Sequence, residues 1–199
     1  MLTDIFKFRN QCEYDFTHDA YEHDPMWGDF EKWKPLYKLK WAIARALKPS
    51  SILEIGVRYG YSAFSFLDAV PDCEYLGVDN DSDSSGGVSG SLAWAQQKLK
   101  KYKSASAIND NSQTLDKLPG ETWDLVHVDG QQTGVSTKHD LSLALEQARW
   151  ILIDGYWWTS INFRSINEWL WDNRASLDFH IVINDVLSRY GDVLIKVGE

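Results

Sequence analysis

Short apolar runs alternate with amphipathic stretches along residues 50–199. The runs are nearly unbroken and rich in β-branched residues, which is typical of strands buried on both faces of a sheet. The runs predict strands at Ile52–Ile55, Tyr75–Asp79, Ala105–Ile108, Leu125–Asp129, Trp150–Asp154, Phe179–Asn184 and Val193–Val197. The amphipathic stretches between them predict helices at Ser62–Ala69, Leu92–Lys101 and Val135–Ala148.

A further helix is predicted before the first strand, from Trp33 to the break at Pro49. Its apolar face consists of residues three or four positions apart, namely Leu36, Leu39, Ile43 and Leu47. Residues 1–32 are aromatic and acidic without clear periodicity. We therefore expect an N-terminal helical arm, residues 1–32, appended to one domain of residues 33–199.

The alternation of buried strands and helices predicts an α/β fold with a doubly wound, mostly parallel, Rossmann-like sheet. The last two strands are joined by only a short LSRYGD connection. A crossover helix does not fit in such a connection, so these strands should form a C-terminal antiparallel hairpin.

A glycine-rich turn follows the first predicted strand, in the sequence Glu54-Ile55-Gly56-Val57-Arg58-Tyr59-Gly60-Tyr61-Ser62. The two glycines would let the backbone approach a ligand closely, and Ser62 could cap the next helix, whose free amides would attract a carboxylate. The pattern ExGxxxG differs from the GxGxxG of dinucleotide sites, which disfavours a nicotinamide oxidoreductase. Asp79 ends the second strand, where its carboxylate could bind both hydroxyls of a ribose. These features predict a nucleoside-containing cofactor.

With these motifs the sequence resembles the class I S-adenosylmethionine-dependent methyltransferases, and most of all the branch of macrocin-type natural-product O-methyltransferases. The resemblance runs from about Trp33 to the C-terminus and rests on ILEIGVRYGYS, YLGVD, INDNSQTL, DLVHVDG, the helix with Asp140, and WILIDGYW. It implies the class I methyltransferase fold, S-adenosylmethionine as cofactor, and methyl transfer to an oxygen of a small molecule.

The same resemblance implies contacts between individual residues and the cofactor. The methionine portion would lie against Glu54, Gly56 and Gly60, with the ribose on the aspartate of the second strand. The adenine would lie near Asn111 and Ser112.

Two carboxylates end neighbouring strands at the same edge of the predicted sheet. Asp129 closes the fourth strand and Asp154 the fifth, and adjacent strands are about 4.8 Å apart. The two charges would repel each other unless a proton or a cation lies between them. A Mg²⁺ ion would relieve the repulsion and polarise an acceptor hydroxyl. Asp129 is therefore the candidate catalytic residue beside the cofactor, and Asp129 and Asp154 are the candidate metal ligands.

The chain departs from its metal-dependent relatives at two places. Gly155 stands where those relatives have a third carboxylate, and Gln131 and Gln132 stand where they commonly have an Asp or His base. A glutamine amide cannot accept a proton at neutral pH. The usual base is therefore absent from its usual place.

Three alternatives follow from these departures. Transfer could be independent of metal and rely on proximity alone. A substitute base could come from His127, His139 or His23, although a structural role is favoured for His127, which shares its side of the strand with Asp129. The chain could also be a non-catalytic S-adenosylmethionine-binding protein or partner subunit.

Ten tryptophans are many for 199 residues. Tyr156, Trp157 and Trp158 directly follow Asp154, at the end of the sheet where an acceptor would enter, and we expect them to contact a planar or sugar-bearing substrate. The aromatic residues of the arm could fold over the site as a lid, pack onto the domain, or form a homodimer interface.

Charge and cysteine content exclude several other classes. The net charge is −9 and no basic tract offsets it, so a nucleic-acid partner is disfavoured. Apolar runs are too short to span a membrane, and the first residues lack the pattern of a secretory signal. Cys12 and Cys73 belong to no metal-binding cluster. We expect a cytoplasmic enzyme with a small-molecule substrate.

Overall fold

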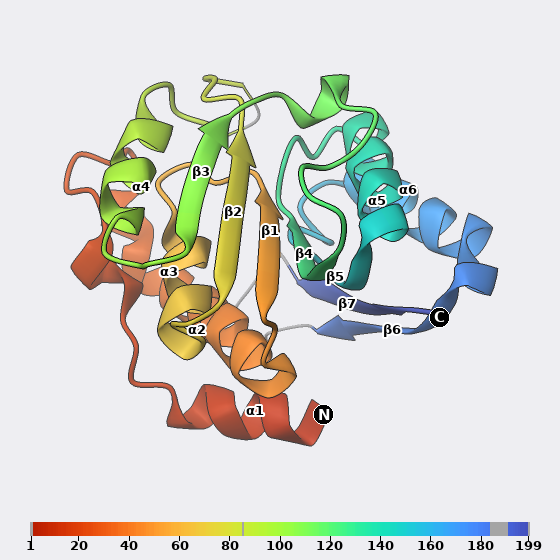
Figure 1. Cartoon of the computed structure of the whole chain (residues 1–199), viewed down its shortest axis with the longest axis horizontal. Coiled ribbons are helices and arrows are strands. Elements are labelled where there is room, and N and C mark those ends of the chain that lie inside the picture. The colour runs from red at the N-terminus through yellow and green to blue at the C-terminus, as the bar shows by residue number, and fades with distance from the viewer. Residues whose placement is uncertain (1, 85, 184–190, 199) are drawn as a thin grey trace.

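The computed structural model describes residues 2–84, 86–183 and 191–198. Its centre is a seven-stranded sheet in the order β3-β2-β1-β4-β5-β7-β6 (Figure 1). The strands are β1 (Ser51–Ile55), β2 (Glu74–Asp79), β3 (Ala105–Asn109), β4 (Trp123–Val128), β5 (Ala148–Ile153), β6 (Leu177–Ile183) and β7 (Asp192–Val197). Strands β1 to β5 are parallel, and β7 runs antiparallel to both β5 and β6. The predicted doubly wound sheet with a C-terminal hairpin is confirmed. Asn184 and most of the predicted LSRYGD connection lie outside the described residues.

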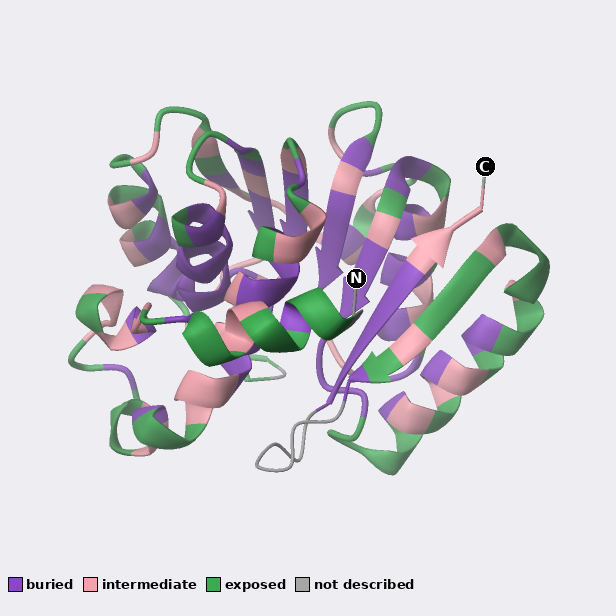
Figure 2. Ribbon diagram, turned by 90° about the horizontal axis from the view of Figure 1, so that it is seen from below, coloured by how far each residue is buried: buried purple, intermediate pink, exposed green. Residues whose placement is uncertain are grey.

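Helices cover both faces of this sheet. They are α1 (Leu2–Gln11), α2 (Phe30–Leu47), α3 (Tyr61–Ala69), α4 (Ser91–Leu99), α5 (Val135–Gln147) and α6 (Ser160–Asp172). Short 3₁₀ turns lie at Phe16–Asp19, Trp27–Asp29, Ser112–Thr114 and Arg174–Ser176. Helices α2, α3 and α4 lie on one face and α5 and α6 on the other, each layer with its own buried apolar cluster (Figure 1). Helix α1 packs against α2, while most of its surface and most of edge strand β6 are exposed (Figure 2).

The N-terminal arm is more ordered than its sequence pattern indicates. Helix α2 begins at Phe30, not at Trp33 as predicted, and α1 is a separate helix with few buried side chains, among them Ile5. A narrow apolar stripe of this kind leaves little periodic signal in the sequence. Among the described residues, none of the helices has both the length and the apolar character needed to cross a bilayer.

Strands β4 and β5 each end one residue before the aspartates that we predicted to close them. Pairing in register still continues past these ends, since Asp129 N donates to Ile55 O at 2.8 Å and Asp154 N donates to Val128 O at 3.0 Å. The backbone of both aspartates is therefore fixed by the sheet.

Candidate active site

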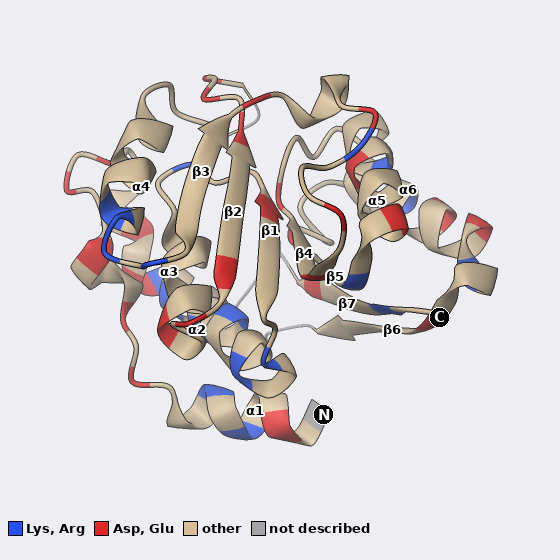
Figure 3. Cartoon of the chain, viewed as in Figure 1, with Lys and Arg blue, Asp and Glu red and all other residues tan. Residues whose placement is uncertain are grey.

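A cavity of about 510 Å³ opens at the carboxyl ends of the parallel strands, within the size range of small-molecule sites. Its lining includes a residue that ends or follows each strand from β1 to β5: Gly56, Asp79, Asn111, Asp129 and Asp154. Acidic residues colour the tips of β1 and β2, whereas much of the basic charge lies on α1, α2 and the turn after α4 (Figure 3). The cavity thus lies at the acidic edge of the sheet, where the sequence predicted a ligand site.

The two glycines of the turn after β1 serve the fold in different ways. Gly56 has φ +89°, and a Cβ there would lie 2.1 Å from the carbonyl oxygen of Asp129. Gly60, at φ +83°, is the N-cap of α3, and a Cβ there would lie 3.0 Å from the ring of Phe64. Gly56 lines the cavity, but Gly60 does not. Both glycines therefore allow a close approach to the protein's own atoms, and the approach of a ligand to this turn stays a prediction.

Ser62 and Glu54 also differ from their predicted roles. Ser62 lies inside α3 and donates its hydroxyl to Glu54 Oε1, so it does not cap the helix. Glu54 is fully buried outside the cavity lining, and its other oxygen accepts a hydrogen bond from Tyr75 Oη. Glu54 faces His127 across the β1–β4 pair, and their side chains meet at 2.8 Å. The Glu54 carboxylate is therefore bonded to the protein's own side chains, and its contact with a cofactor stays a prediction.

Asp79 lies in the cavity wall at the end of β2. One of its oxygens, Oδ2, accepts hydrogen bonds from Val57 N at 2.7 Å and Arg58 N at 2.8 Å, and Oδ1 accepts one from Asp81 N at 2.7 Å. A carboxylate offers about four lone-pair positions, so about one remains, on Oδ1. Asp79 can hold one ribose hydroxyl strongly while it fixes the glycine-rich turn.

The loop after β3 brings Asn111 and Ser112 into the cavity lining. Helix α5 fixes this loop from behind. His139 Nε2 lies 3.0 Å from Ser112 O, and Gln113 donates a 2.7 Å hydrogen bond to Asp140 Oδ1. Asp140 is fully buried and its Oδ2 has no hydrogen-bond partner, and this burial raises the pKa of Asp140 to about 6.

Raising the pH should therefore destabilise the protein through Asp140. Its folded-state pKa of about 6 exceeds the ordinary value of 3.8, so the folded state binds the proton more tightly than the unfolded state. This stabilisation is fully present below about pH 4 and is lost as the pH rises through the folded-state pKa. Asp140→Asn stays neutral throughout, so its free energy of unfolding should fall by about 3 kcal/mol less than that of the wild type over this window. Urea unfolding at acidic and neutral pH measures how much the free energy of unfolding of each protein changes with pH. An equal change in the wild type and in Asp140→Asn would contradict the raised pKa of Asp140.

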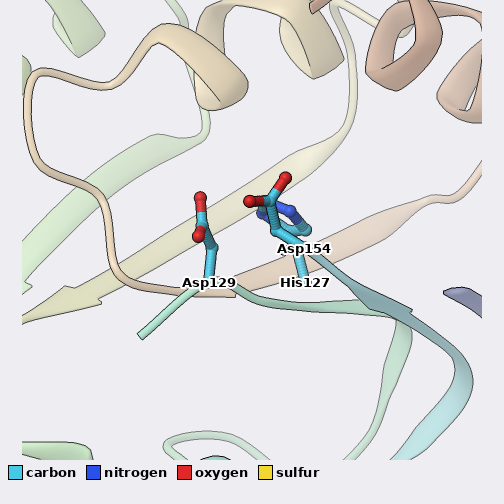
Figure 4. Close-up of side chains that lie close together, drawn as sticks. All are labelled: His127, Asp129 and Asp154. Atoms are coloured by element: carbon cyan, nitrogen blue, oxygen red, sulfur yellow. The ribbon is translucent and has the colours of Figure 1, made fainter. Parts of the chain in front are cut away.

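The acidic edge contains the predicted pair of aspartates and a third that the sequence analysis did not single out. Residues Val128 and Ile153 are paired in the β4–β5 register, which places Asp129 beside Asp154 as predicted (Figure 4). The antiparallel pairing of β5 with β7 brings Asp192, fully buried, next to Asp154.

Lys40 of α2 supplies a buried positive charge to this edge. Its side chain is 1% exposed, and its Nζ lies 2.5 Å from Asp154 Oδ1 and 3.6 Å from Asp192 Oδ1. Burial lowers the pKa of an ammonium group, but the carboxylates of Asp154, Asp192 and Asp129 outweigh burial and raise the pKa of Lys40 above its ordinary value. The lysine is therefore charged, and an ammonium ion lies among the aspartates.

The three carboxyls respond differently to this shared environment. Burial raises the pKa of Asp129 well above its ordinary value, and the neighbouring Asp154 charge adds to the rise. Burial likewise raises the pKa of Asp192 to about 7. Burial acts in the same direction on Asp154, but the ammonium of Lys40 prevails and lowers its pKa. Asp154 is thus the ionised partner of Lys40, whereas Asp129, half-buried in the cavity wall, binds a proton more readily than an ordinary aspartate.

None of the three histidines considered as substitute bases lines the cavity. His127 is fully buried against Phe66, and burial followed by the charge of Lys40 lowers its pKa. Its Nδ1 faces the Glu54 carboxylate, which only accepts hydrogen bonds, so Nδ1 carries the hydrogen and Nε2 is the unprotonated nitrogen. His139 supports the Ser112 loop, and His23 lies on the surface beside Glu22. Unlike these histidines, Asp129 lines the cavity, and its role as a catalytic residue stays a prediction.

A family model for the methyltransferase domain matches residues 53–156, just over half of the chain. The chain belongs to the methyltransferase domain family. The match extends from β1 through the acidic edge to Tyr156. It therefore includes the glycine-rich turn and both predicted aspartates.

Solved structures of methyltransferases share this fold. The Podospora anserina methyltransferase PaMTH1, bound to SAH, is 19% identical with a TM-score of 0.65, and the alignment covers 98% of this chain and 88% of that one. The O-methyltransferase TomG from Streptomyces achromogenes, in complex with SAM, is 17% identical with a TM-score of 0.67 over 100% and 96% of the two chains. The magnesium protoporphyrin IX methyltransferase ChlM from Synechocystis is 15% identical with a TM-score of 0.64 over 98% and 97%. Among curated proteins, none matches the sequence. The protein is thus a methyltransferase with the class I fold.

The three aromatic residues predicted to contact the methyltransferase's substrate have different environments. Trp158 lines the cavity and is 54% exposed. Tyr156 belongs to the buried core beneath and donates its hydroxyl to Asn167. Trp157 stacks on Phe163 at 4.8 Å, outside the lining. Only Trp158 of the three is in position to touch a ligand, because the chain turns sharply at Gly155 and directs successive side chains to different sides.

The N-terminal arm and α2 provide most of the aromatic wall. Phe16, Phe30, Trp33 and Tyr37 line the cavity opposite the ends of the strands. The predictions that the arm packs onto the domain and that it covers the site are thus compatible. Whether it opens as a lid stays a prediction.

A buried carboxylate holds the arm against the methyltransferase's glycine-rich turn. Asp24 accepts hydrogen bonds from two guanidinium nitrogens of Arg58, at 2.8 and 3.0 Å, and from Tyr61 Oη at 2.9 Å. The Asp24 side chain is fully buried, whereas Arg58 is 27% exposed. Arm and turn are therefore joined at the residues that border the cavity.

Removing this carboxylate should loosen the arm. Asp24→Ala leaves Arg58 and Tyr61 without their partner, so we expect a loss of about 2 kcal/mol in the free energy of unfolding, since Arg58 keeps some contact with water. Limited proteolysis should also cut the arm sooner. Asp19→Ala is the matched control, because Asp19 also joins the arm to the domain, through an exposed ion pair with Lys101. Equal effects of the two substitutions would contradict a special role of Asp24.

A third carboxylate at position 155 would meet the side chain of Gln132. Gly155 has φ +69°, and a Cβ there would lie 2.2 Å from the side-chain oxygen of Gln132. The same Gln132 donates its amide to Asp129 Oδ1 at 3.2 Å. Together Gln132 and Lys40 occupy the space around Asp129 and Asp154. The donor set therefore does not fit the oxygen-rich, partly hydrated shell that Mg²⁺ requires.

Lys40 and Asp192 are the site residues that the sequence analysis missed. Lys40 lies four residues after Leu36 and three before Ile43, on the predicted apolar face of the helix. Asp192 directly precedes the last predicted strand, and the antiparallel hairpin brings the start of that strand to the carboxyl edge of the sheet. Two features of the sequence could have indicated these residues: a lysine on the apolar face of a helix, and an aspartate at the start of the last strand.

Proposed function

We propose that this methyltransferase transfers a methyl group from S-adenosylmethionine to an oxygen atom of a small, planar acceptor. The observation that carries the proposal is a single cavity that joins cofactor-type residues to a proton acceptor. Gly56, Asp79 and Asn111 line one part of it, and Asp129 and Trp158 line another. Both reactants could meet there without crossing bulk water.

The residues around the first part of the cavity suit a nucleoside with a charged amino-acid tail. Asp79 retains a lone-pair position for a ribose hydroxyl, as described above. The first amides of α3 have no side-chain cap, and Tyr61 and Ser62 of this turn border the cavity, which favours a bound carboxylate. Asn111 and Ser112 are proposed to lie near the adenine. S-adenosylmethionine, when bound, supplies an electrophilic methyl group on a sulfonium ion.

The second part of the cavity suits an aromatic hydroxyl compound. Aromatic side chains of the arm, of α2 and of the loop after β5 line it, and such faces stack on planar rings. Asp129, with its raised pKa, accepts the hydroxyl proton as the oxygen attacks the methyl carbon. The arm excludes water, and the fixed backbone of Asp129 holds the carboxylate in one place. The resemblance to macrocin-type enzymes remains a prediction about which acceptor is used.

Calorimetric titration with S-adenosylmethionine and S-adenosylhomocysteine tests the cofactor. We expect micromolar binding of both, and at least about tenfold weaker binding by Asp79→Ala, because one charge-assisted hydrogen bond contributes about 1.5–3 kcal/mol. NADH should give no heat of binding. Absence of S-adenosylmethionine binding would overturn the proposal.

Mass spectrometry of a panel of phenols and sugars incubated with the enzyme and the cofactor tests the reaction. We expect a gain of one methyl group on an oxygen. Tight cofactor binding without turnover across the panel would favour the alternative, a non-catalytic S-adenosylmethionine-binding protein or partner subunit.

A further inference from the structure

Three carboxyl groups and an ammonium group meet at the acidic edge. Asp129, Asp154 and Asp192 come from adjacent strands, and Lys40 approaches from α2. The side chains of Lys40, Asp154 and Asp192 are at most 11% exposed. Charges this far from water are stable only when they are paired.

Two of these aspartates and the neighbouring His127 have the composition of a metal site. Ligand-type atoms of His127, Asp129 and Asp154 lie within 4.8 Å of one another (Figure 4). One buried imidazole nitrogen, His127 Nε2, has no hydrogen-bond partner among the residues that the structure describes. An imidazole and two carboxylates could hold a divalent ion if nothing else occupied the space.

Two side chains already use the oxygens that such an ion would need. Asp154 Oδ1 accepts a charge-assisted hydrogen bond from Lys40 Nζ at 2.5 Å. Asp129 Oδ1 accepts the amide of Gln132. A divalent ion would have to displace an ammonium group that is already paired with Asp154, and the two cations would repel each other at short range.

We propose that the Lys40 ammonium is the permanent cation of this acidic cluster and takes the place of a divalent metal ion. It neutralises Asp154 and lies within reach of Asp192, while Asp129, which also lines the cavity, accepts the amide of Gln132. Insofar as the proposed function holds, methyl transfer should be insensitive to chelators, with Lys40 acting as a positioning residue.

Metal binding by the wild type and by Lys40→Ala tests the proposal without cofactor or acceptor, so its failure is distinguishable from failure of the proposed function. The wild type should show no calorimetric heat with Mg²⁺ or Mn²⁺, and neither ion nor EDTA should change its Tm. Lys40→Ala leaves space and uncompensated carboxylates, so its Tm should fall by roughly 10 °C. Millimolar Mn²⁺ or Mg²⁺ should restore part of that loss. The same ions should restore less of the lost Tm in the double variant that combines Lys40→Ala with Asp154→Asn.

Binding of one Mg²⁺ or Mn²⁺ ion per wild-type chain that is lost in Asp154→Asn would overturn the proposal. A folded Lys40→Ala protein that gains no affinity for either ion would also overturn it, because the cluster would then not be a cation site. Should Lys40→Ala fail to fold, the wild-type titration decides, since the proposal requires that no ion binds there. Lys40→Arg, which keeps the charge, should remain indifferent to metal.

Discussion

Asp129→Asn should lower kcat by about 10²- to 10⁴-fold, the usual contribution of a general base. The substitution keeps the shape of the side chain but removes its ability to accept the acceptor's proton. Affinity for S-adenosylmethionine should change little, because the cofactor contacts that we propose lie after β1, at the end of β2 and in the loop after β3. Stability should not fall, since the change removes a carboxyl whose ionisation is opposed by burial and by Asp154. Steady-state kinetics together with calorimetric titration separate these effects.

The dependence of kcat/KM on pH is a second test of the role of Asp129 as a base. Asp129 must be ionised to act as base, so kcat/KM should rise with pH through a pKa above the ordinary range for aspartate. Asp129→Asn should lack this rise. Asp116→Asn is the control, because Asp116 is an exposed carboxylate outside the cavity lining. A kcat within a few-fold of wild type in Asp129→Asn would mean that transfer relies on positioning alone.

Gly56→Ala should destabilise the fold by roughly 3–5 kcal/mol and abolish cofactor binding. Two costs add. The backbone conformation at φ +89° is unfavourable for any residue with a Cβ, and the added methyl would lie 2.1 Å from Asp129 O. Relief requires the turn after β1 to move away from the end of β4, which displaces both the cofactor site and Asp129. Urea unfolding and calorimetric titration measure the two consequences.

Gly90→Ala separates the two costs. Gly90 has φ +86°, but a Cβ there meets nothing within 4 Å. It should therefore show only the conformational cost, about 1–2 kcal/mol. Similar losses in the two variants would show that the close approach of the turn to Asp129 is unimportant for stability.

The order of the elements and the position of the site could be predicted from the sequence. Short, nearly unbroken apolar runs identified each strand of the sheet, because burial of a strand on both faces is visible in the local sequence. In parallel strands, residues that follow the strand ends meet at one edge. For this reason Asp129 and Asp154 could be predicted as neighbours before their contacts were seen.

The chemistry at that edge was decided by tertiary structure. The sequence indicated the repulsion between Asp129 and Asp154 but suggested Mg²⁺ as the cation, whereas the structure places Lys40 there. Nothing in the local pattern of α2 shows which strand end its buried lysine reaches, because that depends on the packing of α2 against the whole sheet.

The direction of side chains in turns could not be predicted from the sequence either. Tyr156, Trp157 and Trp158 follow one another, yet only Trp158 reaches the cavity, because the backbone at Gly155 has a positive φ that no periodic pattern reveals. Gln132 fills the space that Gly155 leaves, and a contact between two loops has no counterpart in the local pattern of either. The sequence by itself thus determined the sheet, its order of elements and the edge at which the cavity opens. The cation beside Asp154 and the aromatic wall of the cavity were decided only where α2, the arm and β7 pack against that edge, because these contacts join residues far apart in the chain.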